Sequence, residues 1–172
     1  FVAKSEFKTW PGLCFLAQLA DTLFVERKPQ KIGFHSKEAA KIMSMGNTIC
    51  FFPEGTSSDG LRVLKFRSSF FQLAYNNIFG TCNPVIHIQP LSLFYAPHSV
   101  DKGNDFYGWW GSMSLFTHMV KVLCQSSGTV TLKFHHLLSS SDYQNRKQLA
   151  SEAEKIIGDE VAYNISTKNF KV

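Results

Sequence analysis

The length and composition of this sequence indicate one globular domain with a basic surface. The chain has 172 residues, of which 44% are hydrophobic and 18% are charged, and its formal net charge at pH 7 is +5. A chain of this size buries enough apolar surface to fold by itself, and its positive charge favours an anionic partner. The basic residues are scattered, and neither a zinc-finger spacing nor an aromatic RNA-binding motif accompanies them, so we do not predict nucleic acid as a partner.

Cysteine spacing and hydropathy exclude two further classes of protein. The four cysteines lie far apart, without the short spacings of a zinc site or the density of a disulfide scaffold. No uninterrupted apolar stretch is as long as a transmembrane helix requires. The sequence begins at Phe1 rather than at a methionine, and we therefore expect that an upstream segment is missing.

Apolar runs alternate with helical periodicities through the first half of the chain. We predict strands at residues 1–3, 23–25 and 49–52, and helices at residues 13–20 and 36–45. The run at residues 49–52 is continuously apolar, which is typical of a strand buried on both faces.

The same alternation continues through the second half. We predict a helix at residues 66–77, a strand at 85–95 that Pro90 interrupts, a helix at 116–123, a half-buried strand at 130–134 and a helix around 149–157. Repeated strand–helix–strand order predicts an α/β fold, with a mostly parallel mixed sheet flanked by helices. We place the domain at residues 1–163 and a C-terminal tail at residues 164–172.

An acidic turn follows the predicted strand at residues 49–52. Pro53 stops the ladder of hydrogen bonds, so Glu54 is held at the end of the strand. Gly55 lets the backbone turn and lets a ligand approach closely. In open α/β sheets, ligands bind beyond the carboxyl ends of parallel strands. The alternative is an ordinary exit from a strand with a solvated carboxylate.

Arg27 occupies a similar position, directly after the predicted strand at residues 23–25. If the two strands are parallel neighbours, Arg27 and Glu54 face one crevice, where the guanidinium group can bind a phosphate or carboxylate with two hydrogen bonds. The alternative is a structural ion pair between Arg27 and Glu54 or Glu26.

Histidines and aromatic residues give weaker indications of function. His135 and His136 end a predicted strand, which favours a polar strand terminus over a metal site. Trp109 and Trp110 lie in an aromatic loop that fits either an anchor at a membrane interface or packing over the core.

In this order and spacing, the motifs resemble those of the phospholipid/glycerol acyltransferase family, which includes 1-acylglycerol-3-phosphate acyltransferases. Residues 22–27 are similar to the family's second motif, residues 52–56 to the third and residues 88–91 to the fourth. Residues 109–111 and 145–150 are most similar to lyso-ornithine lipid O-acyltransferases. The resemblance covers nearly the whole chain and implies a glycerolipid acyltransferase-like fold that lacks its N-terminal segment.

The resemblance implies a function in membrane lipid biosynthesis. A fatty acyl group would pass from an acyl-carrier-protein or CoA thioester to the hydroxyl of a lysolipid, either lyso-ornithine lipid or lysophosphatidic acid, without a metal or other cofactor. Glu54 and Arg27 would be catalytic residues that position the acceptor. The further substrate-binding residues that it implies are Phe52, Pro53, Gly55, Thr56 and Pro90. The protein would work at the cytoplasmic face of the inner membrane, bound peripherally or anchored by the missing segment.

Two departures from the family pattern qualify these expectations. The first motif, His-x-x-x-x-Asp, is absent, since none of the six histidines has an aspartate five positions later. We therefore expect the chain alone to be inactive, and the alternative is a non-catalytic module that binds lipid or an acyl carrier. The second departure is Ser57, where phosphate-using relatives typically carry arginine, and it favours lyso-ornithine lipid as the acceptor.

Overall fold

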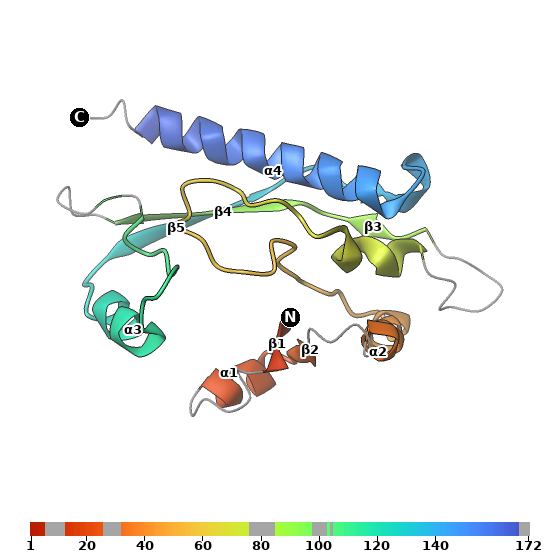
Figure 1. The fold of residues 1–172 in the computed structure, drawn as a ribbon, viewed down its shortest axis with the longest axis horizontal. Coiled ribbons are helices and arrows are strands. Elements are labelled where there is room, and N and C mark those ends of the chain that lie inside the picture. The colour runs from red at the N-terminus through yellow and green to blue at the C-terminus, as the bar shows by residue number, and fades with distance from the viewer. Residues whose placement is uncertain (6–12, 26–31, 76–84, 98–102, 104, 169–172) are drawn as a thin grey trace. The chain divides into compact units, whose positions relative to one another are not determined.

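The chain divides into two compact units, and each is described by itself. The computed structural model describes residues 1–5, 13–25, 32–75, 85–97, 103 and 105–168. The N-terminal unit contains Phe1–Pro53 and Ser69–Pro84, and the C-terminal unit contains Glu54–Ser68 and Val85–Val172. Figure 1 labels α1 to α4 and β1 to β5, whose bounds are given below.

The N-terminal unit is built around a short parallel pair of strands. Its elements are β1 (Val2–Lys4), α1 (Leu13–Leu19), β2 (Leu23–Val25), α2 (Ile32–Ser44) and the 3₁₀ helix η3 (Ser68–Tyr75). β1 and β2 are parallel, with Ala3 opposite Phe24, and α1 connects them. This β1–α1–β2 unit confirms the crossover predicted from the sequence, because parallel strands need such a connection.

The predicted strand at residues 49–52 is wrong as a regular strand. Residues 49–52 carry no strand assignment, although the carbonyl of Cys50 accepts a hydrogen bond from the Val2 N–H at 2.9 Å. The segment therefore lies beside β1, whose three residues offer few partners for a longer ladder. Phe52 is 60% exposed and so is not buried on both faces. Phe51 packs instead on η3, with its ring centroid 5.5 Å from that of the fully buried Phe71.

The C-terminal unit combines antiparallel strands with a long helix. Its elements are β3 (His87–Ile88), β4 (Leu91–Pro97), α3 (Leu115–Leu123), β5 (Gly128–Phe134), β6 (Leu138–Ser139), the 3₁₀ turn η4 (Ser140–Asp142) and α4 (Arg146–Lys168). β4 pairs with β5, and β3 pairs with β6, both in antiparallel orientation.

These pairings confirm the α/β class but correct the expected predominance of parallel strands. Within the described ranges, one pair is parallel and two pairs are antiparallel. The sequence prediction treated the helix between β4 and β5 as a crossover between parallel strands. A long connection can also return the chain in the opposite direction, and the periodicity of a helix does not distinguish the two arrangements.

β3 and β4 continue into one another opposite β5 and β6, and a bulge marks the join. Ile88 pairs with Leu138, and Leu91 pairs with Phe134. Two residues separate the paired positions on one strand, whereas three, 135–137, separate them on the other. The extra residue defines a β-bulge, which is one of the few places where a sheet tolerates proline. The predicted interruption at Pro90 is thereby confirmed.

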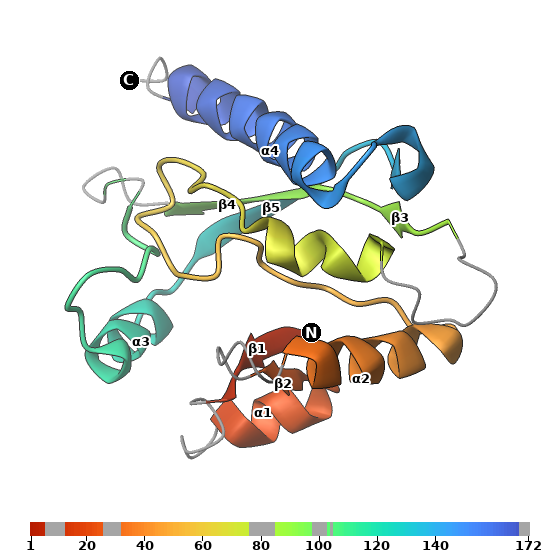
Figure 2. The same ribbon diagram turned by 45° about the vertical axis from the view of Figure 1, so that its right-hand side comes forward.

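Strands β3 and β4, paired with β6 and β5, form a two-stranded antiparallel ribbon. Helix α4 covers one face of this ribbon (Figures 1 and 2). Ser92 and Phe94 of β4 are buried, while Leu93 and Tyr95, which alternate with them, are exposed on the other face. The apolar core positions of α4 are Leu149, Ala150, Ala153 and Val161. All seven residues of β5 are exposed, so the prediction of a half-buried strand is wrong.

The two ends of α4 differ from the sequence expectation in one respect. At its start, the side-chain oxygen of Asn145 accepts hydrogen bonds from the N–H groups of Lys147 and Gln148, at 3.0 and 3.2 Å, as an N-terminal cap does. At its end, the helix continues to Lys168, past the boundary predicted at residue 163. No helix in the described part of the chain is both long and apolar enough to span a membrane.

Candidate functional site

Glu54 closes a loop by holding a backbone group ten residues away. Its side chain is half-buried, and Oε2 accepts a hydrogen bond from the Leu64 N–H at 2.8 Å. Burial raises the pKa of the Glu54 carboxyl above its ordinary value, and the hydrogen bond from Leu64 offsets part of this increase. A carboxyl group with a perturbed pKa is a marker of functional sites, although structural groups share it.

The far end of this loop is held by two short side chains. The Gly60 N–H donates to Ser58 Oγ at 3.2 Å, and the Leu61 N–H donates to Asp59 Oδ1 at 3.0 Å. Side chains that accept a backbone hydrogen bond two residues later stabilise tight turns. Residues 54–64 therefore form an ordered loop whose polar groups hold its own backbone.

Gly55 meets two requirements that other residues do not. Its φ angle is +66°, in the left-handed region, where a Cβ atom is strained. A Cβ atom at this position would also lie 3.1 Å from Nε and 3.2 Å from Cδ of Arg67. The glycine thus allows the side chain of Arg67 to pass directly over the backbone next to Glu54. The exposed Thr56 follows at the loop surface.

Arg67 lies close to the predicted site residue Gly55, and the sequence did not predict this contact. A contact made twelve residues away leaves no periodic signal in the sequence. Arg67 thus lies beside the backbone of Gly55, the residue that follows the half-buried Glu54.

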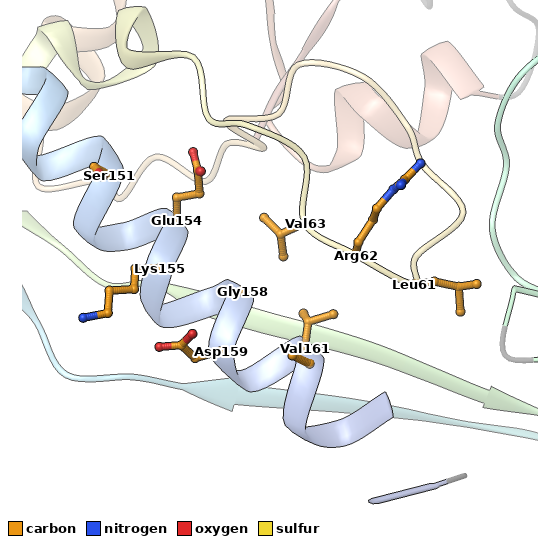
Figure 3. Close-up of a pocket in the computed structure, with 10 residues that line it drawn as sticks. Leu61, Arg62, Val63, Ser151, Glu154, Lys155, Gly158, Asp159 and Val161 are labelled. Carbon is orange, nitrogen blue, oxygen red and sulfur yellow. The ribbon is translucent and has the colours of Figure 1, made fainter. Parts of the chain in front are cut away.

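The segment that follows the loop is bound to helix α4 by a hydrogen bond. Glu154 Oε2 accepts a hydrogen bond from the N–H of the buried Phe66 at 2.7 Å. Residues 61–63 and α4 enclose a hollow of about 550 Å³. Figure 3 shows Val63 directed toward the helix at Gly158, whereas Arg62 extends away from the helix. Both apolar and charged side chains therefore line the hollow.

The remaining predicted site residues are distributed over the molecule. Pro90 is buried at the bulge, and its carbonyl accepts a hydrogen bond from the His135 N–H at 3.1 Å. Phe52 and Pro53 end the first segment of the N-terminal unit. Arg27 lies outside the described residues, so the crevice that it was expected to share with Glu54 stays a prediction. Within the described ranges, no three His, Cys, Asp or Glu side chains are grouped so that they could hold a metal ion.

Comparisons with known proteins agree on one family. A family model described as Acyltransferase matches residues 1–93. The chain is 36% identical over 159 residues to the lyso-ornithine lipid O-acyltransferase of Rhodobacter capsulatus, which covers 91% of this chain and 56% of that protein. It is 31% identical over 173 residues to the enzyme of the same name from Rhizobium meliloti, covering 98% of this chain and 58% of that protein.

Similarity to a second group of relatives is more local. The chain is 36% identical over 75 residues to the 1-acyl-sn-glycerol-3-phosphate acyltransferase of Neisseria gonorrhoeae, which covers 43% of this chain. The crystal structure of the 1-acyl-sn-glycerophosphate (LPA) acyltransferase PlsC from Thermotoga maritima has a similar fold, with a TM-score of 0.57 at 18% identity over 100% of this chain and 57% of that one. The chain spans a little over half the length of the lyso-ornithine lipid relatives it matches.

Proposed function

This chain belongs to the acyltransferase family, and we propose that the protein transfers a fatty acyl group from a thioester donor to the hydroxyl of a lysolipid in membrane lipid biosynthesis. The observation that carries the proposal is the Glu54 loop, because a half-buried carboxylate, a left-handed glycine and an arginine side chain converge there. This loop lies within the part of the chain that the family model matches. The names of the relatives, all lysolipid acyltransferases, support the reaction class.

The reaction replaces a thioester with an ester. The hydroxyl oxygen of the acceptor attacks the thioester carbonyl carbon, the C–S bond breaks, and the carrier leaves as a thiol with the proton that the hydroxyl lost. Glu54 and Arg27 orient the acceptor for this attack, which is worth several orders of magnitude in rate when the geometry is good. The general base is the histidine of the first motif. None of this chain's histidines has that motif's aspartate, so the proposal assigns the base to the part of the relatives' length that the chain does not span.

Lyso-ornithine lipid is the acceptor we propose. The relatives with that name match over at least nine-tenths of this chain, whereas the 1-acyl-sn-glycerol-3-phosphate acyltransferase of Neisseria gonorrhoeae matches less than half. Ser57 agrees with this choice, because a phosphomonoester is best held by additional arginine. The carrier of the acyl group is an acyl-carrier protein or coenzyme A.

We place the protein at the cytoplasmic surface of the membrane, where its lipid substrate lies. Helix α3 supports this placement, since it has no buried residue and carries Phe116, Val120 and Leu123 exposed at the spacing of one helical face. Trp110 and Met113 are exposed just before it, and the Trp109 indole N–H donates to the Met113 carbonyl at 2.9 Å. An exposed apolar helical face together with a basic chain favours an anionic lipid surface.

Vesicle co-sedimentation tests this placement. We expect binding to anionic vesicles that weakens with salt. The substitutions Phe116→Ser and Leu123→Ser should each weaken binding about tenfold, since each removes most of an apolar side chain that the membrane would bury. Leu19→Ser is the matched control, because Leu19 is as exposed as Phe116 but lies on α1. Equal binding by all variants would exclude α3 as the contact surface.

An acylation assay of the complete protein tests the function. Lyso-ornithine lipid and lysophosphatidic acid are offered side by side, each with acyl-carrier-protein and CoA thioesters. We expect transfer to lyso-ornithine lipid to be preferred. A preference for lysophosphatidic acid would refute the proposed acceptor. Tight binding of lipid or acyl carrier without transfer would instead support the non-catalytic module.

A further inference from the structure

The bulge opposite Gln89 and Pro90 leaves one backbone carbonyl without its usual partner. Two residues in a hydrogen-bonded antiparallel pair normally exchange two N–H···O bonds. The His135 N–H donates to the Pro90 carbonyl at 3.1 Å, but proline has no N–H to donate in return. The side-chain amide of Gln89 donates to the His135 carbonyl at 3.1 Å and so replaces the missing bond.

The imidazole of His135 adds a third contact to the same segment. His135 Nε2 lies 2.8 Å from Ser92 Oγ, and Ser92 is 0% exposed. A buried hydroxyl without a partner is unfavourable, so this bond matters to the conformation of β4. His135 thus holds Gln89, Pro90 and Ser92 through its carbonyl, its N–H and its ring.

The charged groups around His135 are already paired with one another. Lys133 of β5 donates to the Glu160 carboxylate of α4, and Glu160 also accepts from Asn164 Nδ2 at 2.7 Å. Burial lowers the pKa of His135, the charge of Glu160 offsets part of this change, and Lys133 and His136 add to it. The ring is therefore neutral near pH 7, where one nitrogen accepts and the other donates a hydrogen bond.

We propose that His135 is a positioning residue for acyl transfer, which holds the Gln89–Pro90 bulge in the shape that the substrate contacts. The inference rests on the proposed function and on the expectation, implied by the family resemblance, that Pro90 binds substrate. A purely structural role would lower the folded fraction and so the apparent kcat, while both KM values stayed the same. A positioning role raises the KM of the one substrate that contacts the bulge.

Steady-state kinetics of the complete protein distinguish these roles. We expect His135→Ala to raise the KM of either the donor or the acceptor about tenfold, with a smaller change in kcat, because Ser92 loses its partner. His135→Gln places an amide near the position of Nε2 and should restore most of the loss. His136→Ala is the matched control, since His136 is the exposed neighbour, and it should leave both KM values unchanged.

Two further variants test the same contacts from the other side. Gln89→Met removes the amide but keeps the length of the side chain, and it should raise the same KM even if His135→Ala fails to fold. Adding Ser92→Ala to His135→Ala should not raise KM further, because both substitutions remove the same hydrogen bond. Unchanged KM values in His135→Ala and Gln89→Met, with an active wild type, would overturn this inference alone. A wild type that transfers no acyl group would overturn the proposed function and this inference with it.

Discussion

The Glu54 loop and the bulge at Pro90 both hold irregular backbone, but with groups of different kinds. In the loop, the carboxylate of Glu54 accepts the hydrogen bond from Leu64. In the bulge, the amide of Gln89 and the ring of His135 supply the partners. The loop therefore depends on an ionisable group whose burial raises its pKa, whereas the bulge uses groups that are neutral near pH 7.

This difference indicates what each region is suited for. A neutral amide or a tyrosine could close the Glu54 loop without the desolvation that burial imposes on a carboxylate. In the proposed function, the charge of Glu54 has a second role, which is to orient the acceptor. The bulge has no ionised group among the hydrogen-bond partners that hold it, and its polar groups serve to fix the shape of the backbone.

The largest effect is expected when the carboxylate is removed. Glu54→Ala should lower kcat/KM for acyl transfer by a factor of 100 or more, on the order of what one positioned catalytic group contributes. Circular dichroism should show that the helices are retained, because Glu54 lies in a loop. Asp59→Ala is the control, since Asp59 also accepts a backbone hydrogen bond within the loop, and it should cost about threefold or less. Equal losses in both variants would make Glu54 a structural residue only.

A smaller effect is expected from filling the space under Arg67. Gly55→Ala introduces a Cβ atom at φ +66° and 3.1 Å from the Arg67 side chain. The backbone strain should cost about 1 kcal/mol, and the displaced arginine should lower activity further. Gly60→Ala bears the same strain at φ +75° but meets no atom within 4 Å. Activity that is lower in Gly55→Ala than in Gly60→Ala measures the contact with Arg67, and equal activity would show that the contact is dispensable.

The smallest effect is on stability and depends on pH. Because the folded-state pKa of Glu54 is raised, the folded protein holds this proton more tightly than the unfolded chain, and ionised Glu54 opposes folding at neutral pH. Glu54→Gln should therefore unfold at a slightly higher temperature than the wild type at pH 7. The difference should vanish as the pH falls below the ordinary pKa of a glutamate. A Glu54→Gln protein that is less stable at pH 7 would contradict this assignment.

The pKa shift of Glu160 has the opposite sign to that of Glu54, so Glu160 serves as the comparison. Its hydrogen bond with Lys133 is the main reason that its pKa is lowered, and the Asn164 amide lowers it further. The stability that Glu160 contributes is present above the unfolded-state pKa and is lost as the pH falls through the folded-state value. Thermal unfolding of Glu160→Gln should accordingly show a loss at pH 7 that disappears in acid.

Local features of the fold followed from the sequence, and features set by distant contacts did not. Helices α1, α2, α3 and α4 were predicted because apolar residues recur at helical spacing, and Pro90 was predicted to break its strand because it lacks an N–H group. The antiparallel orientation of β5 was missed, since direction is fixed by the partner strand and not by periodicity. Glu54 and Gly55 were predicted as site residues from their place at the end of an apolar run, and the structure shows the loop that they form. Leu64, Arg67 and Glu154 were not found, because their roles depend on contacts made across the fold.

The extra residue in the ribbon also inverts the sidedness of the strand that carries it. Phe134 and Leu138 are four positions apart, and in an uninterrupted strand they would share a face. Phe134 is 63% exposed and Leu138 is 3% exposed, since the intervening residue shifts the alternation by one step. The bulge thus shifts the alternation of side chains by one residue. Odd-numbered positions face α4 before the bulge, and even-numbered positions are buried after it. A deletion of one residue at 136–137 would remove the bulge and leave Leu138 three positions after Phe134, on the opposite face, so Leu138 would stay in the core.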